Sequence, residues 1–427
     1  MGKKKSLRWV RLDTAATIFP AASRKEWSNV FRQSITLRED VDVDVLREAL
    51  DVTVKRFPSI AARLRRGMFW YYLQQVEKAP EIVHESSYPL VYMSPKEMRR
   101  CALRVIVYHN RIAVEYFHSL TDGTGGMIFL KTLVAEYLER KYDIQIPCEQ
   151  GVLCRTEAPR EGELENSFAK YAGPVGASRA ETNAWHMQEE LQTDNFLHLT
   201  CFRLPVTETL ALAHEHDATV TVFLCAAMMK ALANLQAQKV PNVKRRAPIK
   251  VRLPVNLRPL FGSNTLRNFM SFTTPEMDPR EGEYSFDEIC SLIKHRMGLD
   301  ITKKHMAAMN AANVMVEQNP FVRIAPLPFK DVVMRVGFDR YGERKACLTM
   351  SNLGVVKMPD EMKPFVERVD FLLGSQSNAP YNCAVIAYGD MINVNFIRDT
   401  RDAQLERCFF QVLRDMGLSV TVESNRA

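Results

Sequence analysis

The 427-residue chain contains no uninterrupted apolar run of the roughly 18 residues that a membrane-spanning helix requires. Its most apolar stretch, residues 220–229, ends at Lys230, and we predict a buried helix there and no transmembrane segment. No apolar core follows the basic segment from Met1 to Ser6, so we expect no secretory signal peptide. That segment also fits the N-myristoylation pattern, although a solvated basic terminus is the more frequent explanation of so short a match.

Paired cysteines and metal-ligand clusters are missing as well. The nine cysteines are odd in number and scattered, and no C-x-x-C occurs, which argues against a disulfide framework. His214 and His216 flank a glutamate, but no further ligand lies at a suitable spacing, and we expect no metal site. A reducing, cytoplasmic location fits this cysteine usage best.

Neither sign of charge is in large excess. The net charge is +7, and the 46% hydrophobic and 25% charged residues are typical of a soluble globular protein. No basic stripe is interleaved with aromatic residues, so we expect no nucleic-acid partner. The lysines and arginines cluster at 244–246, 250–252 and 303–304, and nothing in the sequence chooses among these clusters as a site for an anionic ligand.

The length favours two domains of mixed α/β structure, because one hydrophobic core rarely serves so long a chain. Residues 155–195 lose periodicity and collect Glu, Ala, Gly, Ser and Pro174, which is typical of a linker. We therefore predict an N-terminal domain over 1–160, a crossing linker over 161–195 and a C-terminal domain over 196–427.

Hydrophobic periodicity predicts the main elements. Strands are expected at 32–37, 69–76, 103–108, 112–117, 197–204, 249–254, 346–351, 383–388 and 392–396, and helices at 44–57, 127–138, 207–216, 220–235 and 402–416. A strand–loop–helix unit near 111–139 recurs near 390–416. Either a duplicated pair of domains or the chance recurrence of a common unit explains this similarity.

The most informative segment runs from His118 to Gly126, between a predicted strand and a predicted helix. Histidine is the natural general base at neutral pH, and a strand end followed by a glycine loop brings side chains into clefts. The alternative is a capped helix start, in which Asp122 complements the helix dipole and His118 is merely half-buried.

Several motifs carry a resemblance to a known family. His118-x-x-x-Asp122-Gly123 resembles the H-x-x-x-D-G signature of the CoA-dependent acyltransferase superfamily, which includes chloramphenicol acetyltransferase, BAHD acyltransferases and condensation domains. Residues 255–259 and 267–269 are similar to its V-N-x-R and later G-N segments, with Arg267 where glycine is usual. Residues 351–354 provide a weaker match. Residues 11–20 look most like the bacterial alcohol acetyltransferase-like branch.

The resemblance implies two pseudo-symmetric chloramphenicol-acetyltransferase-like domains with an active-site tunnel between them and His118 at its centre. It implies transfer of an acyl group, most simply acetyl from acetyl-CoA, to an alcohol or amine acceptor, with His118 as general base. The remaining implied site residues fall into three groups. Asp122, Gly123, Arg258 and Asn268 would support the site, Ser351 or Asn352 would donate to the oxyanion, and Gly125 and Gly126 would let the pantetheine arm of CoA pass.

Departures from the family patterns refine this expectation. D-F-G-W-G is missing, which argues against the BAHD branch, and Phe117 stands where condensation domains carry a second histidine. No carrier or lipoyl domain is recognisable, so we expect a stand-alone enzyme that uses free acyl-CoA. We also expect a monomer. Two alternatives stay open: a carrier-dependent condensation or polyketide-associated acyltransferase, and a non-catalytic binding protein. The intact His118-x-x-x-Asp122-Gly123 motif argues against the second alternative, and the Arg267 departure keeps it open. The methionines at 306, 309 and 315 either line an adaptable pocket or pack in a core.

Overall fold

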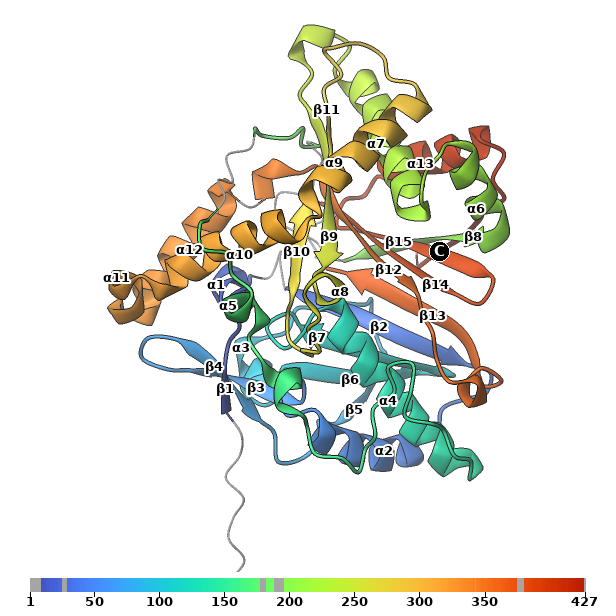
Figure 1. The fold of residues 1–427 in the computed structure, drawn as a ribbon. Helices are drawn as coiled ribbons and strands as arrows, with labels where there is room; N and C mark the ends of the chain where they lie inside the picture. The colour runs from blue at the N-terminus through green and yellow to red at the C-terminus, as the bar shows by residue number, and fades with distance from the viewer. Residues whose placement is uncertain are drawn as a thin grey trace, which may run out of the picture.

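The computed structural model describes residues 9–24, 29–176, 182–187, 196–341, 343–374 and 380–425. Two layered domains lie one above the other, and the first half of the chain builds most of the lower domain in Figure 1. The predicted mixed α/β class is confirmed, and so are the helices and strands that the periodicity predicted, to within a few residues at their ends.

The N-terminal domain is a five-stranded sheet in the order β13-β2-β7-β6-β5, in which β13 spans Val366–Leu373. The sheet packs against two helices that contact each other, α2 and α4. Its elements are β2 (Val30–Leu37), α2 (Val43–Arg56), β5 (Ile82–His84), β6 (Leu103–Tyr108), β7 (Arg111–Phe117) and α4 (Gly123–Tyr142). Asp42 caps α2 by accepting from the backbone N–H groups of Asp44 and Val45. The α4 helix is buried around most of its circumference, which is why its sequence is apolar on several faces.

A small three-stranded sheet, in the order β1-β4-β3, lies beside this domain. It comprises β1 (Trp9–Arg11), β3 (Ala62–Arg66) and β4 (Tyr71–Gln75). Four short helices complete the connections: α1 (Ile18–Ala22), α3 (Pro95–Met98), α5 (Ser167–Lys170) and α8 (Arg258–Phe261). Within the predicted linker, residues 177–181 and 188–195 lie outside the described residues.

The C-terminal domain is an eight-stranded sheet in the order β10-β9-β12-β14-β15-β8-β16, with β11 beside β9. Its strands are β8 (His198–Pro205), β9 (Ile249–Asn256), β10 (Met270–Thr273), β11 (Glu276–Met277), β12 (Leu348–Val355), β14 (Tyr381–Tyr388), β15 (Met391–Arg398) and β16 (Thr421–Ser424). Its helices are α6 (Val206–Glu215), α7 (Val220–Lys239), α9 (Phe286–Asp300) and α13 (Gln404–Asp415). The odd-numbered residues of β14 from 381 to 387 face this domain's core, whereas Ala384 and Ile386 join the core of the first domain.

In the described part of the chain, α7 alone is long and apolar enough to cross a membrane; its mean hydropathy is 1.5, and 67% of the 18-residue window is buried. Its side chains, from Val222 to Leu235, belong to the second core. The structure thus accounts for its hydrophobicity by packing between α13, α9 and the sheet.

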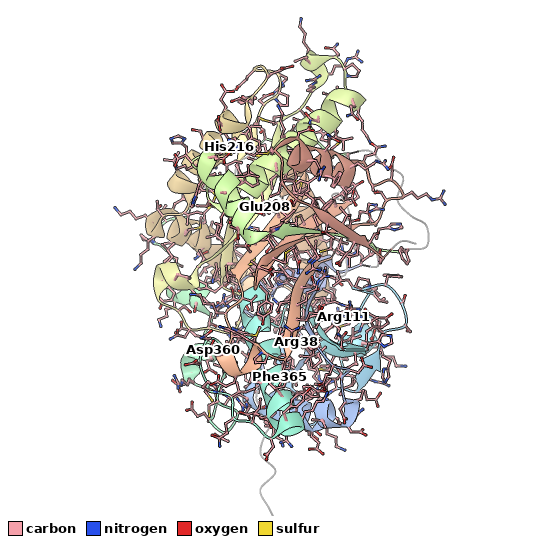
Figure 2. The ribbon with its side chains drawn as sticks, turned by 90° about the vertical axis from the view of Figure 1, so that its right-hand side faces the viewer. Arg38, Arg111, Glu208, His216, Asp360 and Phe365 are labelled. Atoms are coloured by element: carbon pink, nitrogen blue, oxygen red, sulfur yellow. The ribbon has the colours of Figure 1, made fainter. Side chains whose placement is uncertain are left out.

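One strand crosses between the domains. β13 (Val366–Leu373) comes from the second half of the chain, yet it pairs antiparallel with β2 of the first sheet. At its start, the backbone N–H of Arg38 donates to the Phe365 carbonyl (3.0 Å), and both residues lie together near Asp360 in Figure 2. The predicted domains, divided at residue 196, assign β13 to the C-terminal domain, whereas its pairing places it in the N-terminal sheet.

Three helices, α10 (Lys303–Gln318), α11 (Pro320–Ile324) and α12 (Leu327–Tyr341), form an arm at the left of Figure 1. The α12 helix packs against α1, and the backbone N–H of Leu327 donates to the carbonyl of Met68 in the β3–β4 turn (3.1 Å). The arm therefore lies against the N-terminal segment, close to the residues described next.

Candidate active site

His118 follows directly after β7 and precedes α4. Its backbone N–H donates to the Asn29 carbonyl (2.8 Å). Its half-buried ring stacks on Phe19 (ring centroids 4.5 Å apart, planes 15° apart) and meets Phe31 edge-on at 5.1 Å. The two aromatic rings hold the plane of the imidazole.

The hydrogen bonds of Asn268 determine which ring nitrogen of His118 carries the proton. The Asn268 Nδ2 group donates to the His118 carbonyl (2.9 Å), which can only accept, and also to Asp13 Oδ2 (3.3 Å). The amide oxygen, Oδ1, consequently faces His118 Nδ1 at 3.0 Å. Because Oδ1 can only accept, Nδ1 carries the hydrogen, and Nε2 keeps a lone pair for a base.

Burial lowers the pKa of His118 below its ordinary value of 6.5, although the Asn268 hydrogen bond and the charges of Asp122 and Asp13 oppose this shift. The imidazole is therefore neutral at neutral pH. A neutral imidazole with an unprotonated Nε2 is the form that a general base requires.

Asp122 and Arg258 form a buried bidentate ion pair, with Nη–Oδ distances of 2.9 and 3.0 Å. Asp122 also caps α4 through the Gly125 N–H (3.1 Å) and accepts from the Phe269 N–H (2.9 Å). Arg258 donates in addition to the Arg267 carbonyl (2.6 Å). The pair connects the loop that carries His118 to the segment that carries Asn268.

The three glycines of the loop approach other parts of the chain closely. A Cβ atom at Gly125 would lie 2.3 Å from the Leu266 carbonyl oxygen, and one at Gly126 would lie 2.7 Å from Oε1 of Gln33. A Cβ at Gly123 would lie 2.7 Å from the Leu353 side chain. Protein atoms fill the space beside Gly125 and Gly126, so the idea that they accommodate pantetheine stays a prediction without support from this geometry.

Ser351 and Asn352 lie on β12, next to that contact. Met350 packs in the second core, whereas Leu353 packs against the first and reaches Gly123; by strand alternation, Ser351 shares the face of Leu353. Asn352 is engaged on both polar atoms: Nδ2 donates to Thr221 Oγ1 (2.9 Å), and Oδ1 accepts from the Gly354 N–H (2.7 Å). Both oxyanion donors stay predictions, and the two hydrogen bonds of Asn352 make Ser351 the one that we consider further.

Asp13 and Arg267 are site residues to which sequence reasoning assigned no role. Asp13 is fully buried and accepts from Asn268 and from the Ala16 N–H (2.8 Å), and Arg267 Nε lies 3.7 Å from its carboxylate. Burial raises the pKa of Asp13, and the Arg267 charge opposes that rise. The opposite charges of Arg267 and Asp13 thus compensate each other inside the protein. The only signal of this pairing in the sequence was an arginine at position 267, where the family motif has glycine.

Two cavities flank the domain junction. One of about 160 Å³ is lined by residues that include Leu12, Thr17, Trp70 and Arg323, between the N-terminal segment and the α10–α12 arm. Another of about 670 Å³ is lined by Arg38, Lys357, Lys363 and Arg368, among others, near the crossing strand. His118 lines neither of these two cavities, and the tunnel past it stays a prediction.

The described residues contain no group of three or more His, Cys, Asp or Glu side chains arranged to hold a metal ion. His216 instead places Nδ1 at 2.5 Å from Asp287 Oδ1 and its ring against Phe286, far up the C-terminal domain in Figure 2. All nine cysteines are free thiols.

No protein-family model matches the chain, and no curated protein matches it. Solved structures match over its whole length. F. graminearum TRI101, complexed with coenzyme A and deoxynivalenol, is 11% identical with a TM-score of 0.65, and the match covers 97% of this chain and 99% of that one. TRI3 trichothecene 15-O-acetyltransferase from Fusarium sporotrichioides is 11% identical (TM-score 0.58; coverage 97% and 96%).

Polyketide synthase associated protein 5 from Mycobacterium tuberculosis is 15% identical, with a TM-score of 0.57 and coverage of 95% and 98%. At such identities the similarity concerns the fold. Both domains and their connection therefore match those of the similar structures, from one end of the chain to the other.

Proposed function

Because the chain has the two-domain fold of the CoA-dependent acyltransferase and condensation superfamily, we propose that it transfers an acyl group from acyl-CoA to an alcohol. The observation that carries this proposal is the state of His118: its Nδ1–H is committed to Asn268 and its Nε2 is free to accept a proton. The superfamily reaction needs one base of this kind, and His118 has this state at the start of the H-x-x-x-D-G motif, directly after β7.

In the proposed reaction, His118 Nε2 removes the proton of the acceptor hydroxyl while the hydroxyl oxygen attacks the thioester carbonyl carbon. A C–O bond forms, and the carbonyl oxygen carries the negative charge of the tetrahedral intermediate. When this intermediate collapses, the C–S bond breaks and the imidazolium returns the proton to the CoA sulfur. The products are an ester and free CoA, and the enzyme is unchanged.

Other residues would assist in distinct ways. Ser351 is the proposed hydroxyl donor to the oxyanion. Such a donor stabilises the negative charge best when it is already in place before the charge develops. Asn268 would keep Nδ1 protonated as positive charge develops on the ring, and the Asp122–Arg258 pair would hold the loop in place. Positioning residues of this kind act through His118 and not on the substrate.

The proposed co-substrate is free acyl-CoA, most simply acetyl-CoA, and the proposed acceptor is a small-molecule alcohol, with an amine as the second choice. Two structural neighbours support this proposal: TRI101 was solved with coenzyme A and deoxynivalenol, and TRI3 is named a 15-O-acetyltransferase. The free thiols favour a reducing, cytoplasmic location, and we propose a monomer.

One neighbour favours a second candidate function. The similarity to polyketide synthase associated protein 5 fits an acyl donor presented on a carrier protein in place of free CoA. The chemistry at His118 would be the same, since both donors are thioesters of a phosphopantetheine arm.

The test is thiol release from acetyl-CoA with a panel of alcohols and amines. Replacement of His118 by Ala should lower the acceptor-dependent rate by about 10²–10⁴-fold, the usual contribution of a positioned base. His84→Ala is the matched control, because His84 is an exposed histidine on β5 and should leave the rate unchanged.

Each other outcome points elsewhere. Transfer from a phosphopantetheinylated carrier but not from free acyl-CoA would replace the first proposal by the second. Full activity in His118→Ala would overturn both, and failure of CoA and carrier donors alike to bind would leave a non-catalytic binding protein of the same fold.

A further inference from the structure

The α10–α12 arm exposes a dense group of apolar side chains. Those with the largest exposed fractions are Phe321 (81%), Ile324 (68%), Phe329 (65%), Val316 (63%) and Val332 (62%), joined by Met315, Val333 and Val336. We call these eight residues the arm surface. Single exposed apolar residues are ordinary on proteins, but so many on three consecutive helices form a patch, and patches of this kind mark interaction sites.

The α12 helix turns two of its charged side chains, Lys330 and Asp331, inward and exposes several of its apolar side chains. Lys330 is only 4% exposed; its Nζ donates to the Phe69 carbonyl (2.8 Å) and lies 3.5 Å from the centre of the Trp70 ring. Asp331 accepts from the hydroxyl of Tyr71 (3.0 Å). Lys330 and Asp331 thus make their contacts on the inner side of the helix, while Val332 and Val333 face the solvent. An ordinary surface helix has the opposite arrangement at such positions.

The patch continues onto the β3–β4 turn, which the arm holds by backbone hydrogen bonds. Met68 is 75% exposed, its neighbour Phe69 is also exposed, and Met68 receives the Leu327 N–H at 3.1 Å. The two elements come from opposite halves of the chain, and this hydrogen bond brings exposed apolar residues of both together on the side of the molecule where the arm lies (Figure 1).

The charged groups at the edge of this surface are mostly positive. Arg66, Arg323 and Arg335 are exposed. Among the side chains that the structure describes, the nearby carboxylates of Asp331 and Glu317 accept hydrogen bonds from Tyr71 and from Thr14 (2.7 Å) respectively. Exposed cations around an apolar patch complement the anionic head groups of a lipid bilayer.

From this combination we propose that the arm surface docks on an anionic lipid surface, with its valine, isoleucine and phenylalanine side chains inserted among the acyl chains and the three arginines at the head groups. A lipid fits better than a protein partner, because the arm surface is mostly aliphatic and contains no tyrosine or tryptophan, whereas protein interfaces are enriched in tyrosine, tryptophan and arginine at their centres.

The position of the arm connects this docking surface to the candidate active site. The α12 helix packs on α1, and Phe19 of α1 stacks on the His118 ring. The cavity of about 160 Å³ lies between the arm, at Val314 and Arg323, and the N-terminal segment, at Leu12 and Thr17. The arm thus carries the proposed docking surface and also contributes residues to the wall of this cavity.

The test is co-sedimentation of the full chain with vesicles, made of phosphatidylcholine alone or mixed with phosphatidylglycerol, with no substrate present. The wild type should bind the mixed vesicles, and the triple variant Phe321→Ser, Val332→Ser, Val333→Ser should bind at least about tenfold more weakly, because insertion depends on buried apolar area. A second variant, Arg66→Gln with Arg323→Gln, should lose the preference for anionic vesicles and bind both kinds equally.

Matched controls keep the experiment interpretable. Leu210→Ser, Val243→Ser and Val422→Ser replace apolar residues outside the arm that are 39–46% exposed, and their combination should bind like the wild type. Thermal unfolding should show that each variant is folded, which exposed positions favour. Because no acyl transfer is measured, a negative result here leaves the proposed reaction untouched.

Three outcomes would overturn the proposal. The wild type could fail to bind either vesicle, or the triple variant could bind as tightly as the wild type. In the third case, sedimentation without lipid would show that the wild type is a dimer and the triple variant a monomer, and neither would bind vesicles. The arm surface would then join two copies of this chain.

Discussion

At the scale of single residues, the orientation of one amide decides the chemistry of the candidate site. Asn268 has two acceptors for its NH₂ group, so its oxygen has to face His118 Nδ1. These contacts join three residues that lie far apart in the sequence, at positions 13, 118 and 268. No local pattern in the sequence contains this information.

The lowered pKa of His118 has a consequence for the pH dependence of activity. Because the base has to be neutral, kcat/KM should rise with pH and level off, with the midpoint of the acid limb below pH 6.5. The folded state binds this proton less tightly than the unfolded chain does, so stability also falls as the pH drops below 6.5. A pH–rate profile checks this; an acid limb centred above 6.5 would contradict it.

Replacing Asn268 by Ala should lower kcat by about 10–100-fold, the range found when a group that orients a catalytic ligand or base is removed. The KM for acyl-CoA should change little, because Asn268 acts through His118. Steady-state kinetics separates the two parameters, and Asn242→Ala, at an exposed turn, is the control. An unchanged kcat would show that the rings of Phe19 and Phe31 suffice to orient the base.

At the scale of elements, the β7–α4 loop is held by contacts that leave no room for side chains. Gly125→Ala would place a Cβ at 2.3 Å from the Leu266 carbonyl oxygen, and the fold has to shift to accept it. We expect a loss of about 1–3 kcal/mol in the free energy of unfolding, as for other overpacked sites.

Gly298→Ala is the matched substitution. Gly298 lies inside α9 with no atom within 4 Å of its Cβ position, and alanine there should raise stability by about 0.5–1 kcal/mol. Chemical denaturation of both variants measures the contrast. Equal stability of the Gly125 variant and the wild type would mean that the 264–267 segment moves freely.

The ion pair between Asp122 and Arg258 connects α4 to the segment after β9. Asp122→Asn leaves a buried guanidinium without its counter-charge, which should cost about 3–5 kcal/mol and lower activity in parallel. Glu157→Gln, which breaks an exposed pair with Arg160, should change stability by at most about 1 kcal/mol. An Asp122→Asn variant with full stability and no activity would instead give Asp122 a direct catalytic role.

At the scale of the whole molecule, the exchange of β13 makes the two domains depend on each other. β13 completes the first sheet, while Asn393 and Asn395 of β15 donate to its Val369 and Phe371 carbonyls, both at 3.0 Å. We expect calorimetry to show one cooperative transition, with equal calorimetric and van't Hoff enthalpies. Two separate transitions would mean that the crossing strand does not couple the domains.

The sequence determined much of this protein by local physics. Alternation predicted β6 and β7, helical spacing predicted α2 and α13, and a strand, a glycine loop and a helix placed His118 at a junction. These features depend on neighbouring residues, so a pattern is enough to predict them. The pairing of Asp122 with Arg258 came from the family resemblance, and the structure contains it.

Only the tertiary structure decided the rest. The exchange of β13, the Asp13–Asn268–His118 contacts and the Asp13–Arg267 pair join residues far apart in the chain, and periodicity carries no record of such partners. The arm surface is the same kind of case: the sequence of α12 mixes valines with Lys330 and Asp331, and only the fold shows which side faces the solvent. Local order follows from neighbouring residues, whereas the direction in which a side chain points depends on what the whole chain packs against it.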